Sequence, residues 1–146
     1  MTQRTVYQSM PRRLLVSLPP SASVHEAACV MTRANCGSVL VVGAGTQLLG
    51  IVTERDLMTR VLAKAVDPSK TTLAGVMTPN PRCIGPNTKV EDAVLIMLER
   101  GFRHLPVVGD GNTLLGVFSA RDAMPREIGA AVSLAEFNEQ VNDSLG

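Results

Sequence analysis

The sequence has few of the features that mark exported, membrane-spanning or non-specific nucleic-acid-binding proteins. Aromatic residues make up only 3% of its 146 residues and tryptophan is absent, so the interior must be packed with aliphatic side chains, methionine and alanine. Hydrophobic residues make up 45%, which is enough for one domain or for two small repeats that share a core. Fourteen basic and thirteen acidic residues leave a formal charge of +1 and no block of like charge, which argues against a nucleic-acid partner.

Long hydrophobic runs are also missing. Purely apolar runs such as Val39–Val42 are far too short to span a bilayer. Near the N-terminus, Arg4, Gln8, Arg12 and Arg13 interrupt any stretch of signal-peptide length. We therefore expect a cytoplasmic protein without a membrane partner.

Cysteine is scarce. Cys29, Cys36 and Cys83 are odd in number and show no C-x-x-C spacing, so neither a disulfide framework nor a zinc site is indicated. We interpret all three as small buried hydrophobic residues.

The chain contains an internal duplication. Aligning Val24 with Val90, at an offset of 66 residues, carries Asp56 onto Asp122 without a gap. About a third of the aligned positions are identical, and most of the others exchange similar residues. The two copies are therefore expected to fold in the same way.

Each copy is predicted to contain a helix, two strands joined by a tight Gly-x-Gly turn, and a second helix. Capping boxes at Ser23–Glu26 and Thr88–Glu91 predict where the first helices begin. Pro125 fits only the first turn of a helix, so the last helix of the second copy must start late or the chain must bend there. The remaining elements are expected at Ser38–Val42, Leu48–Val52, Leu57–Lys64, His104–Val108, Leu114–Phe118, near Ala123, and at Val132–Val141.

These patterns divide the chain into parts and fix its fold class. The predicted parts are an N-terminal segment (1–14), a first repeat (15–66), a linker (67–75), a second repeat (76–128) and a C-terminal helix or tail (129–146). The first fifteen or so residues and the tail lie outside the detected duplication. The fold class is α/β (α+β), with a small sheet and flanking helices in each repeat, packed around one core with pseudo-twofold symmetry.

The order of these motifs resembles a pair of CBS (cystathionine-β-synthase) domains. Gly50–Asp56 and Gly116–Asp122 both have the form Gly-hydrophobic-hydrophobic-Thr/Ser-x-x-Asp. Val76–Pro79, Arg103–Val108 and Ser69–Thr72 are further similar features, and the chain looks most like small bacterial proteins that contain little besides one such pair. The resemblance implies a regulatory module without catalytic activity that binds AMP, ADP, ATP, NAD(H) or S-adenosyl compounds between its repeats, usually as a homodimer. No other cofactor is implied.

The signature residues allow two interpretations. Thr53 and Asp56, like Ser119 and Asp122, have the spacing of a capping box, which needs no ligand. The same groups suit a nucleotide, because a hydroxyl at a helix start favours phosphate oxygens and an acidic side chain accepts both hydrogen bonds of a ribose diol. In ligand-binding members of the family, the matching Thr/Ser and Asp residues have these roles.

The resemblance assigns further residues to the site. Arg103 and His104 match positions that contact phosphate, although a solvated arginine and a satisfied histidine would look the same. The first copy has Gly37 and Ser38 there, so the two clefts should be unequal and one can be empty. The other candidates are Arg55 and Arg121 for phosphate or a helix surface, Val16, Ser17, Cys83 and Ile84 beside adenine, Leu105 and Pro106 in the strand after His104, and Lys70, Thr71 and Thr72 in what is otherwise a polar linker.

Other function classes have weaker support. Gly43–Gly45 is followed by a predicted strand and not by a helix, so it is a hairpin turn and not a dinucleotide fingerprint. His25 and His104 are the only histidines, and no nucleophile motif accompanies them, which argues against an enzyme. The sequence therefore predicts a nucleotide-binding module that reports energy or redox state to a protein partner. The alternative is an interaction protein whose nucleotide sites are vestigial.

Overall fold

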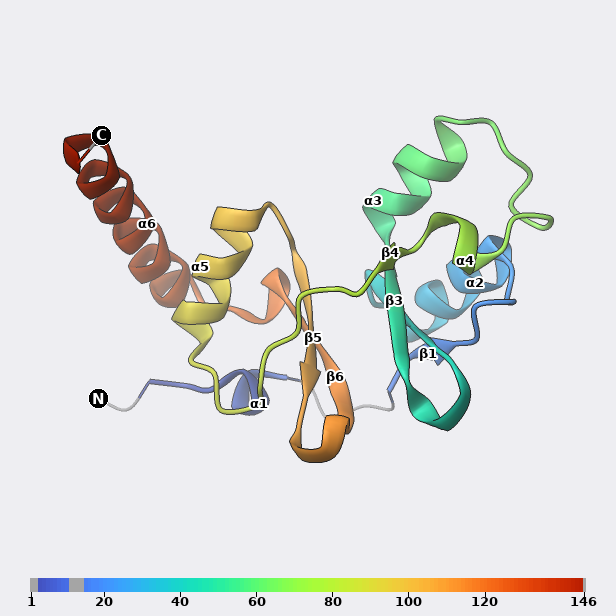
Figure 1. Ribbon diagram of the computed structural model, residues 1–146, viewed down its shortest axis with the longest axis horizontal. Helices are drawn as coiled ribbons and strands as arrows, with labels where there is room; N and C mark the ends of the chain where they lie inside the picture. The colour runs from blue at the N-terminus through green and yellow to red at the C-terminus, as the bar shows by residue number, and fades with distance from the viewer. Residues whose placement is uncertain (1–2, 11–14, 146) are drawn as a thin grey trace.

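The computed structural model describes residues 3–10 and 15–145, the last of these without its side chain (Figure 1). The first half contains α1 (Val6–Ser9), β1 (Ser17–Leu18), α2 (Val24–Ala34), β2 (Ser38–Val42), β3 (Leu48–Thr53), α3 (Glu54–Asp56) with its continuation η2 (Leu57–Leu62), α4 (Leu73–Val76) and β4 (Thr78–Pro79). The second contains α5 (Val90–Arg100), β5 (His104–Val108), β6 (Leu114–Ser119), η4 (Ala120–Asp122) and α6 (Pro125–Leu145). Helices flank small sheets in both halves, as the sequence predicts.

An antiparallel hairpin forms the centre of each repeat, and the two hairpins have the same register. Ser38 lies opposite Thr53 in the β2–β3 pair, and His104 lies opposite Ser119 in the β5–β6 pair. The first sheet has the order β1-β2-β3-β4, with β1 parallel to β2. In the second repeat the corresponding parallel pairing is a single bridge from Ile84 to Val107. The register confirms that the sequence duplication is a structural one.

Short helical turns, η1 (Ala44–Thr46) and η3 (Asp110–Asn112), join the strands of the two hairpins. Gly45 and Gly111 have φ values of 68° and 65°, in a backbone region that residues with a Cβ atom adopt much less often than glycine. The predicted Gly-x-Gly turns are therefore confirmed, and both follow a register shift at the end of the preceding strand.

Neither of the two predicted capping boxes forms in full, because at α2 only the Ser23 half is present. Ser23 caps α2 by accepting a hydrogen bond from the backbone N–H of Glu26. At α5 the N-cap position falls on Lys89, which makes no side-chain cap, so the box predicted from Thr88 is wrong by one residue. The Thr88 carbonyl accepts the N–H of Val6 instead, which ties this segment to α1.

The N-terminal segment also belongs to the duplication. The N–H of Val6 in α1 donates to Thr88 O, and the N–H of Leu73 in α4 donates to Ala22 O at the equivalent place. The helix that precedes each repeat therefore packs on the other repeat, and Figure 1 shows α1 (blue) beside the second repeat. Sequence comparison does not detect this relation because α1 and α4 are only four residues long.

Buried apolar side chains form two clusters, one in each repeat, where one core was predicted. The first repeat's cluster includes Leu73 of α4, and the second repeat's cluster includes Val6 of α1. Leu40 and Pro106, at matching positions of the two hairpins, are fully buried outside both clusters. The linking helices thus complete the core of the repeat that they contact.

The methionines and cysteines differ in how far they are buried. Met31 and Met97 are each only 5% exposed because they pack inside their own repeats, so they offer no surface for a dimer contact. Cys29 lies on the exposed side of α2, so it is not a buried hydrophobic residue. All three cysteines are free thiols, and Cys36 and Cys83 are partly buried.

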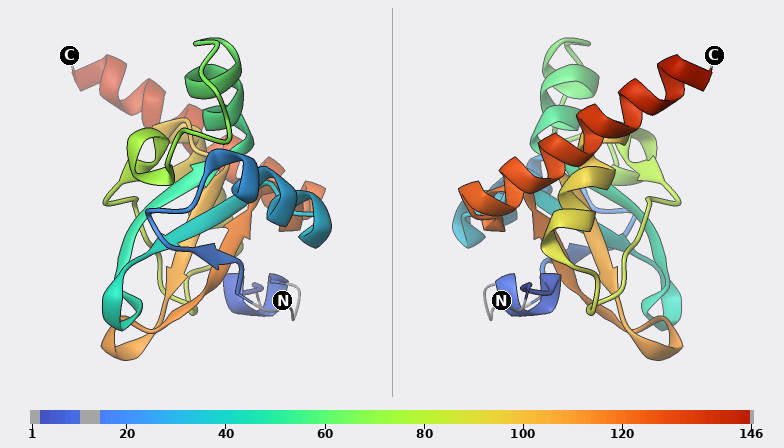
Figure 2. Two further views of the ribbon diagram at one scale, coloured as in Figure 1. Left: turned by 90° about the vertical axis from the view of Figure 1, so that its right-hand side faces the viewer. Right: turned by 90° about the vertical axis from the view of Figure 1, so that its left-hand side faces the viewer.

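The predicted closing helix is longer than expected. It begins at Pro125, which occupies the first turn as its fixed φ requires, and α6 lies across α5 (Figure 2, right). Side chains exposed on α6 include those of Leu134, Phe137 and Val141. Among the residues described, none of the helices combines the length and apolar character needed to cross a bilayer.

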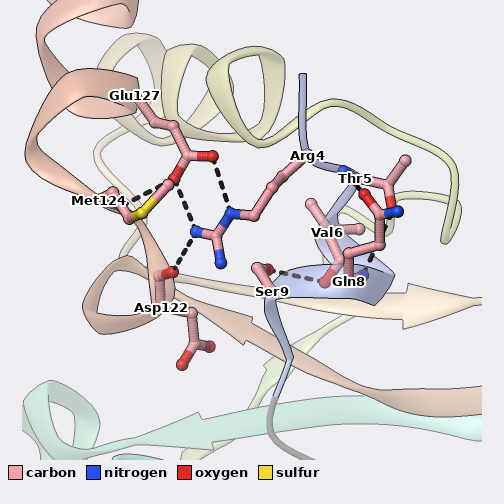
Figure 3. Close-up of polar contacts among 8 residues, drawn as sticks. All are labelled: Arg4, Thr5, Val6, Gln8, Ser9, Asp122, Met124 and Glu127. Carbon is pink, nitrogen blue, oxygen red and sulfur yellow. Dashed lines mark hydrogen bonds and ion pairs between the residues drawn. The ribbon is translucent and has the colours of Figure 1, made fainter. Parts of the chain in front are cut away.

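An ion pair fastens the N-terminal segment to the start of α6 (Figure 3). Arg4 Nη2 and Nε lie 2.7 and 3.0 Å from the two carboxylate oxygens of Glu127, and Nη2 also donates to the carbonyl of Asp122. Glu127, only 3% exposed, accepts the N–H of Met124 as well. The hydrogen bonds from Arg4, chief among these contacts, hold the pKa of Glu127 below its ordinary value.

Replacing Glu127 with Gln should destabilise the protein by about 1–3 kcal/mol at pH 7, because Arg4 would lose its partly buried partner. Since the pKa of Glu127 is lowered on folding, the ionised pair stabilises the fold above the unfolded-state pKa, and this contribution is lost as pH falls through the folded-state pKa. The difference between wild type and variant in urea unfolding should therefore shrink between about pH 5 and pH 3. Glu139→Gln, at an exposed site on the same helix, is the control, and a difference independent of pH would contradict this role.

Candidate functional site

The second strand of each hairpin ends at a signature pair, and each pair lines a cleft between the repeats. At the end of β3, the Thr53 N–H donates to Asp56 Oδ2 at 2.9 Å, and Thr53 Oγ1 accepts the Asp56 N–H at 3.3 Å. Asp56 is only 8% exposed, and its Oδ1 lies 3.7 Å from Arg60 Nε. The predicted capping box is therefore present. Asp56 Oδ2 accepts its hydrogen bonds, whereas Oδ1 only approaches Arg60.

The second signature pair repeats this arrangement in a shorter turn. The Ser119 N–H donates to Asp122 Oδ2 at 3.0 Å, but Ser119 Oγ accepts the N–H of Arg121 at 3.3 Å. The turn η4 ends after three residues, whereas α3 continues into η2. Asp122 is partly exposed and lies at the end of the turn.

Two clefts each contain a signature pair, and the larger of these two has a volume of about 430 Å³. Thr53, Arg55 and Asp56 of the first repeat line it, together with Arg103 and His104 of the second. Its other lining residues are Ile51, Glu54, Met58, Thr78, Pro81, Arg82, Gly101 and Phe102. Residues that the sequence analysis assigned to one nucleotide site, from segments far apart in the chain, thus come together here.

The smaller cleft, about 90 Å³, contains the second signature pair. Ser119, Arg121 and Asp122 face Val16, Gly37 and Ser38 across it, with Met10, Leu15, Cys36, His104, Leu115, Gly116 and Val117 completing the lining. A Cβ atom on Gly116 would lie 2.7 Å from the terminal carbon of Met10, so this methionine sits against the strand that bounds the cleft. The clefts are unequal, as the difference between the copies predicts.

Gly37 and His104 lie close together where the two clefts adjoin. His104 lines both of them, and a Cβ atom on Gly37 would lie 2.9 Å from His104 Nε2 and would collide with the carboxylate of Glu54. Burial lowers the pKa of His104, with Arg103 and Arg121 adding to the effect and Glu54 and Asp122 opposing it. The imidazole is therefore mainly neutral at pH 7 and can donate one hydrogen bond.

Several predicted residues lie outside the lining of both clefts. Ser17 pairs with Leu40 in the sheet, and Thr71 donates its hydroxyl to the carbonyl of Asp67. Thr72 forms an isolated bridge with Ser23, and Lys70 is exposed in the linker. The remaining ones are Ile84, Leu105 and Pro106, which are buried, and Cys83, which lies in a separate hollow near the hairpin turns.

Sequence reasoning missed three residues of the larger cleft that precede or begin the second repeat, namely Thr78, Pro81 and Arg82. The signal was available in part, because Thr78 belongs to a segment that resembles the family. Arg82 stands next to Cys83, which the analysis did select. Residues 81–83 form no strand, and no motif or periodic pattern marks Arg82 as a lining residue.

The family model described as "CBS domain" matches residues 8–63 and 73–126. The chain belongs to the CBS-domain family. The two matched segments coincide with the structural repeats, and each includes one signature pair.

Similar proteins include CBS-domain structures with bound AMP. A "CBS domain protein" from Pyrobaculum aerophilum, complexed with AMP, has a TM-score of 0.77 and 24% identity over 90% of this chain and all of that one. CBSX2, also in complex with AMP, has a TM-score of 0.66 and 30% identity over 89% of this chain and 97% of that one. The "Meiotically up-regulated gene 70 protein" of Schizosaccharomyces pombe is 41% identical over 65% of this chain, but the match spans only 14% of its own length.

Asp56→Ala should lower the free energy of unfolding in the absence of nucleotide by about 1–2 kcal/mol, because it removes a helix cap and leaves the Thr53 N–H without its acceptor. Asp122→Ala should cost less, since its turn continues into no helix. Urea unfolding of both variants measures the difference. Unchanged stability of Asp56→Ala would show that the capping box contributes nothing to the fold.

Proposed function

We propose that the chain is a non-catalytic regulatory module that binds an adenosine nucleotide in the larger cleft. The observation that carries this proposal is the convergence of Thr53 and Asp56 with Arg103 and His104 in one cavity of about 430 Å³. A sugar-binding carboxylate and phosphate-binding donors are thereby available from opposite repeats. Cavities of a few hundred Å³ with a few convergent polar groups are typical of small-molecule sites.

Asp56 can cap the helix and bind a ligand at the same time, because its two carboxylate oxygens have different partners. Its Oδ2 accepts hydrogen bonds from the Thr53 N–H and hydroxyl at 2.9 and 3.1 Å, while Oδ1 lies 3.7 Å from Arg60 Nε and accepts no hydrogen bond from the described residues. A ribose diol donates hydrogen bonds to such a carboxylate oxygen. We therefore assign Asp56 to the ribose, and Thr53, Arg103 and His104 to phosphate.

The proposed ligands are AMP, ADP, ATP or NAD(H). Support comes from the AMP bound by CBSX2, which is 30% identical to this chain. The smaller cleft, at about 90 Å³, offers less space, and the Arg121 that lines it donates to the carbonyl of Asn35. We propose that it stays empty.

Regulation would follow from linkage between binding and the arrangement of the repeats. A nucleotide that contacts both repeats stabilises the arrangement in which it can do so. The stabilisation is RT ln(1 + [L]/Kd), about 2.7 kcal/mol when the ligand is in hundredfold excess over Kd. A partner that contacts both repeats would respond to that change, and so to the energy or redox state of the cell. A homodimer remains a prediction, and the exposed side chains of Leu134, Phe137 and Val141 are available for such a contact.

Calorimetry with AMP, ADP, ATP, NADH and S-adenosylmethionine tests the proposal. Asp56→Asn should weaken binding of the preferred nucleotide about tenfold or more, because one charge-assisted hydrogen bond is lost. Asn can still accept the Thr53 N–H, so the fold should be retained.

Asp122→Asn is the matched control in the smaller cleft and should change the affinity by less than about twofold. An equal loss in both variants would contradict the assignment of the larger cleft. The absence of a calorimetric signal with every nucleotide would favour the interaction protein with vestigial sites.

A further inference from the structure

An open groove between α5 and α6 is both apolar and acidic. Leu98 and Phe137 are among the apolar side chains that line it, and the carboxylates in its lining include Glu99 and Asp143. Phe137 is 60% exposed, more than any other large apolar side chain described in α6. None of the described lining residues is basic, and no basic residue follows Arg126 in the sequence. We call this surface the acidic groove, and it suits a partner that is apolar and basic.

The other end of the molecule carries a surface of that kind. Leu62, at the end of η2, is 73% exposed, the largest value among the large apolar side chains described. Arg60 and Lys64 lie on either side of it in the sequence, and no acidic residue occurs between Leu57 and Val66. The exposed Lys64 side chain makes no hydrogen bond or ion pair with the described residues. We call Arg60, Leu62, Lys64 and Val66 the basic patch.

The acidic groove and the basic patch of one chain lie too far apart to meet. Figure 1 shows α6 (red) and the helix formed by α3 and η2 (green) at opposite ends of the long axis, both rising on the same side of the molecule. Two copies that face each other on this side and are related by a twofold axis can therefore pair in two ways. Either like surfaces meet, groove against groove and patch against patch, or each groove meets the patch of the other copy.

Charge decides between these two arrangements. Pairing of like surfaces would bring Glu99 toward the carboxylates of the second copy and Lys64 toward another ammonium group, and like charges placed together at an interface oppose association. Pairing of groove with patch places carboxylates opposite Lys64 in two equal contacts. It also covers Leu62 and Phe137, which are otherwise in water. The second arrangement is therefore favoured by charge and by apolar burial together.

We propose that two copies of the chain form a head-to-tail dimer in which the basic patch of each copy occupies the acidic groove of the other. The inference rests on the homodimer included in the proposed function and gives it an orientation and a contact surface. It makes no use of the nucleotide, so its failure and the failure of nucleotide binding are separate results. The apolar side chains supply most of the attraction, and the charges set the orientation.

Sedimentation equilibrium without nucleotide tests the orientation by exchanging two charges. The variants are Lys64→Glu, Glu99→Lys, the double variant with both changes, and the control Arg33→Glu, which alters an exposed arginine of α2 outside both surfaces. Wild type and control should be dimers with similar dissociation constants. Each single change puts like charges together at both contacts and should weaken the dimer at least about tenfold. The double variant restores opposite charges and should recover most of that loss. All three positions are exposed, so the fold should be retained.

Several results would overturn the inference. A wild-type chain that stays monomeric over the whole concentration range would remove the dimer. A dimer that Lys64→Glu leaves unchanged, or that Arg33→Glu weakens equally, would not be formed by the basic patch. A double variant no tighter than the single variants would show that Lys64 and Glu99 do not face each other. Nucleotide binding, which calorimetry measures on the same samples, would be unaffected by each of these results.

Discussion

The close approach of the two repeats at Gly37 is the constraint on which the site depends. His104 of the second repeat and Glu54 of the first both reach the space that a Cβ atom on Gly37 would occupy. At the matching position the second repeat has Arg103, whose side chain lines the larger cleft. This difference between the copies gives the larger cleft the guanidinium of Arg103, which we propose to contact phosphate, and lets the repeats meet closely at Gly37. The backbone symmetry is kept, while the two clefts become chemically different.

The signature motif has a structural role and remains available for a ligand. In this structure, Thr53 and Asp56 form the cap that sequence spacing alone predicts, and Ser119 and Asp122 form a weaker version. Capping does not compete with nucleotide binding, because it uses mainly one oxygen of the Asp56 carboxylate. It also fixes that carboxylate at the edge of the cleft before any ligand arrives, which reduces the ordering cost of binding.

Most of the fold was predictable from the sequence because the duplication gives two independent readings of each element. The central strands begin and end within one residue of their predicted bounds, and Pro125 marks the start of the last helix. The exchange of α1 and α4 between repeats was not predictable, since four-residue helices carry too little pattern. The partly buried pair Arg4–Glu127 was missed for a related reason, because it joins residues 123 positions apart that stand outside any motif. Arg82 was missed because it stands in an irregular segment before the isolated bridge at Ile84, where no motif or periodic pattern marks the lining of a cleft.

The most direct measurement of the central claim is the number of nucleotides bound per chain. Equilibrium dialysis with labelled ATP over a range extending well above the dissociation constant gives this number without assumptions about heat or conformation. The asymmetry set by Gly37 and Arg103 predicts saturation at one nucleotide per chain, irrespective of dimer formation. Saturation at two would contradict the chemical difference between the clefts, and saturation at zero would contradict nucleotide binding itself.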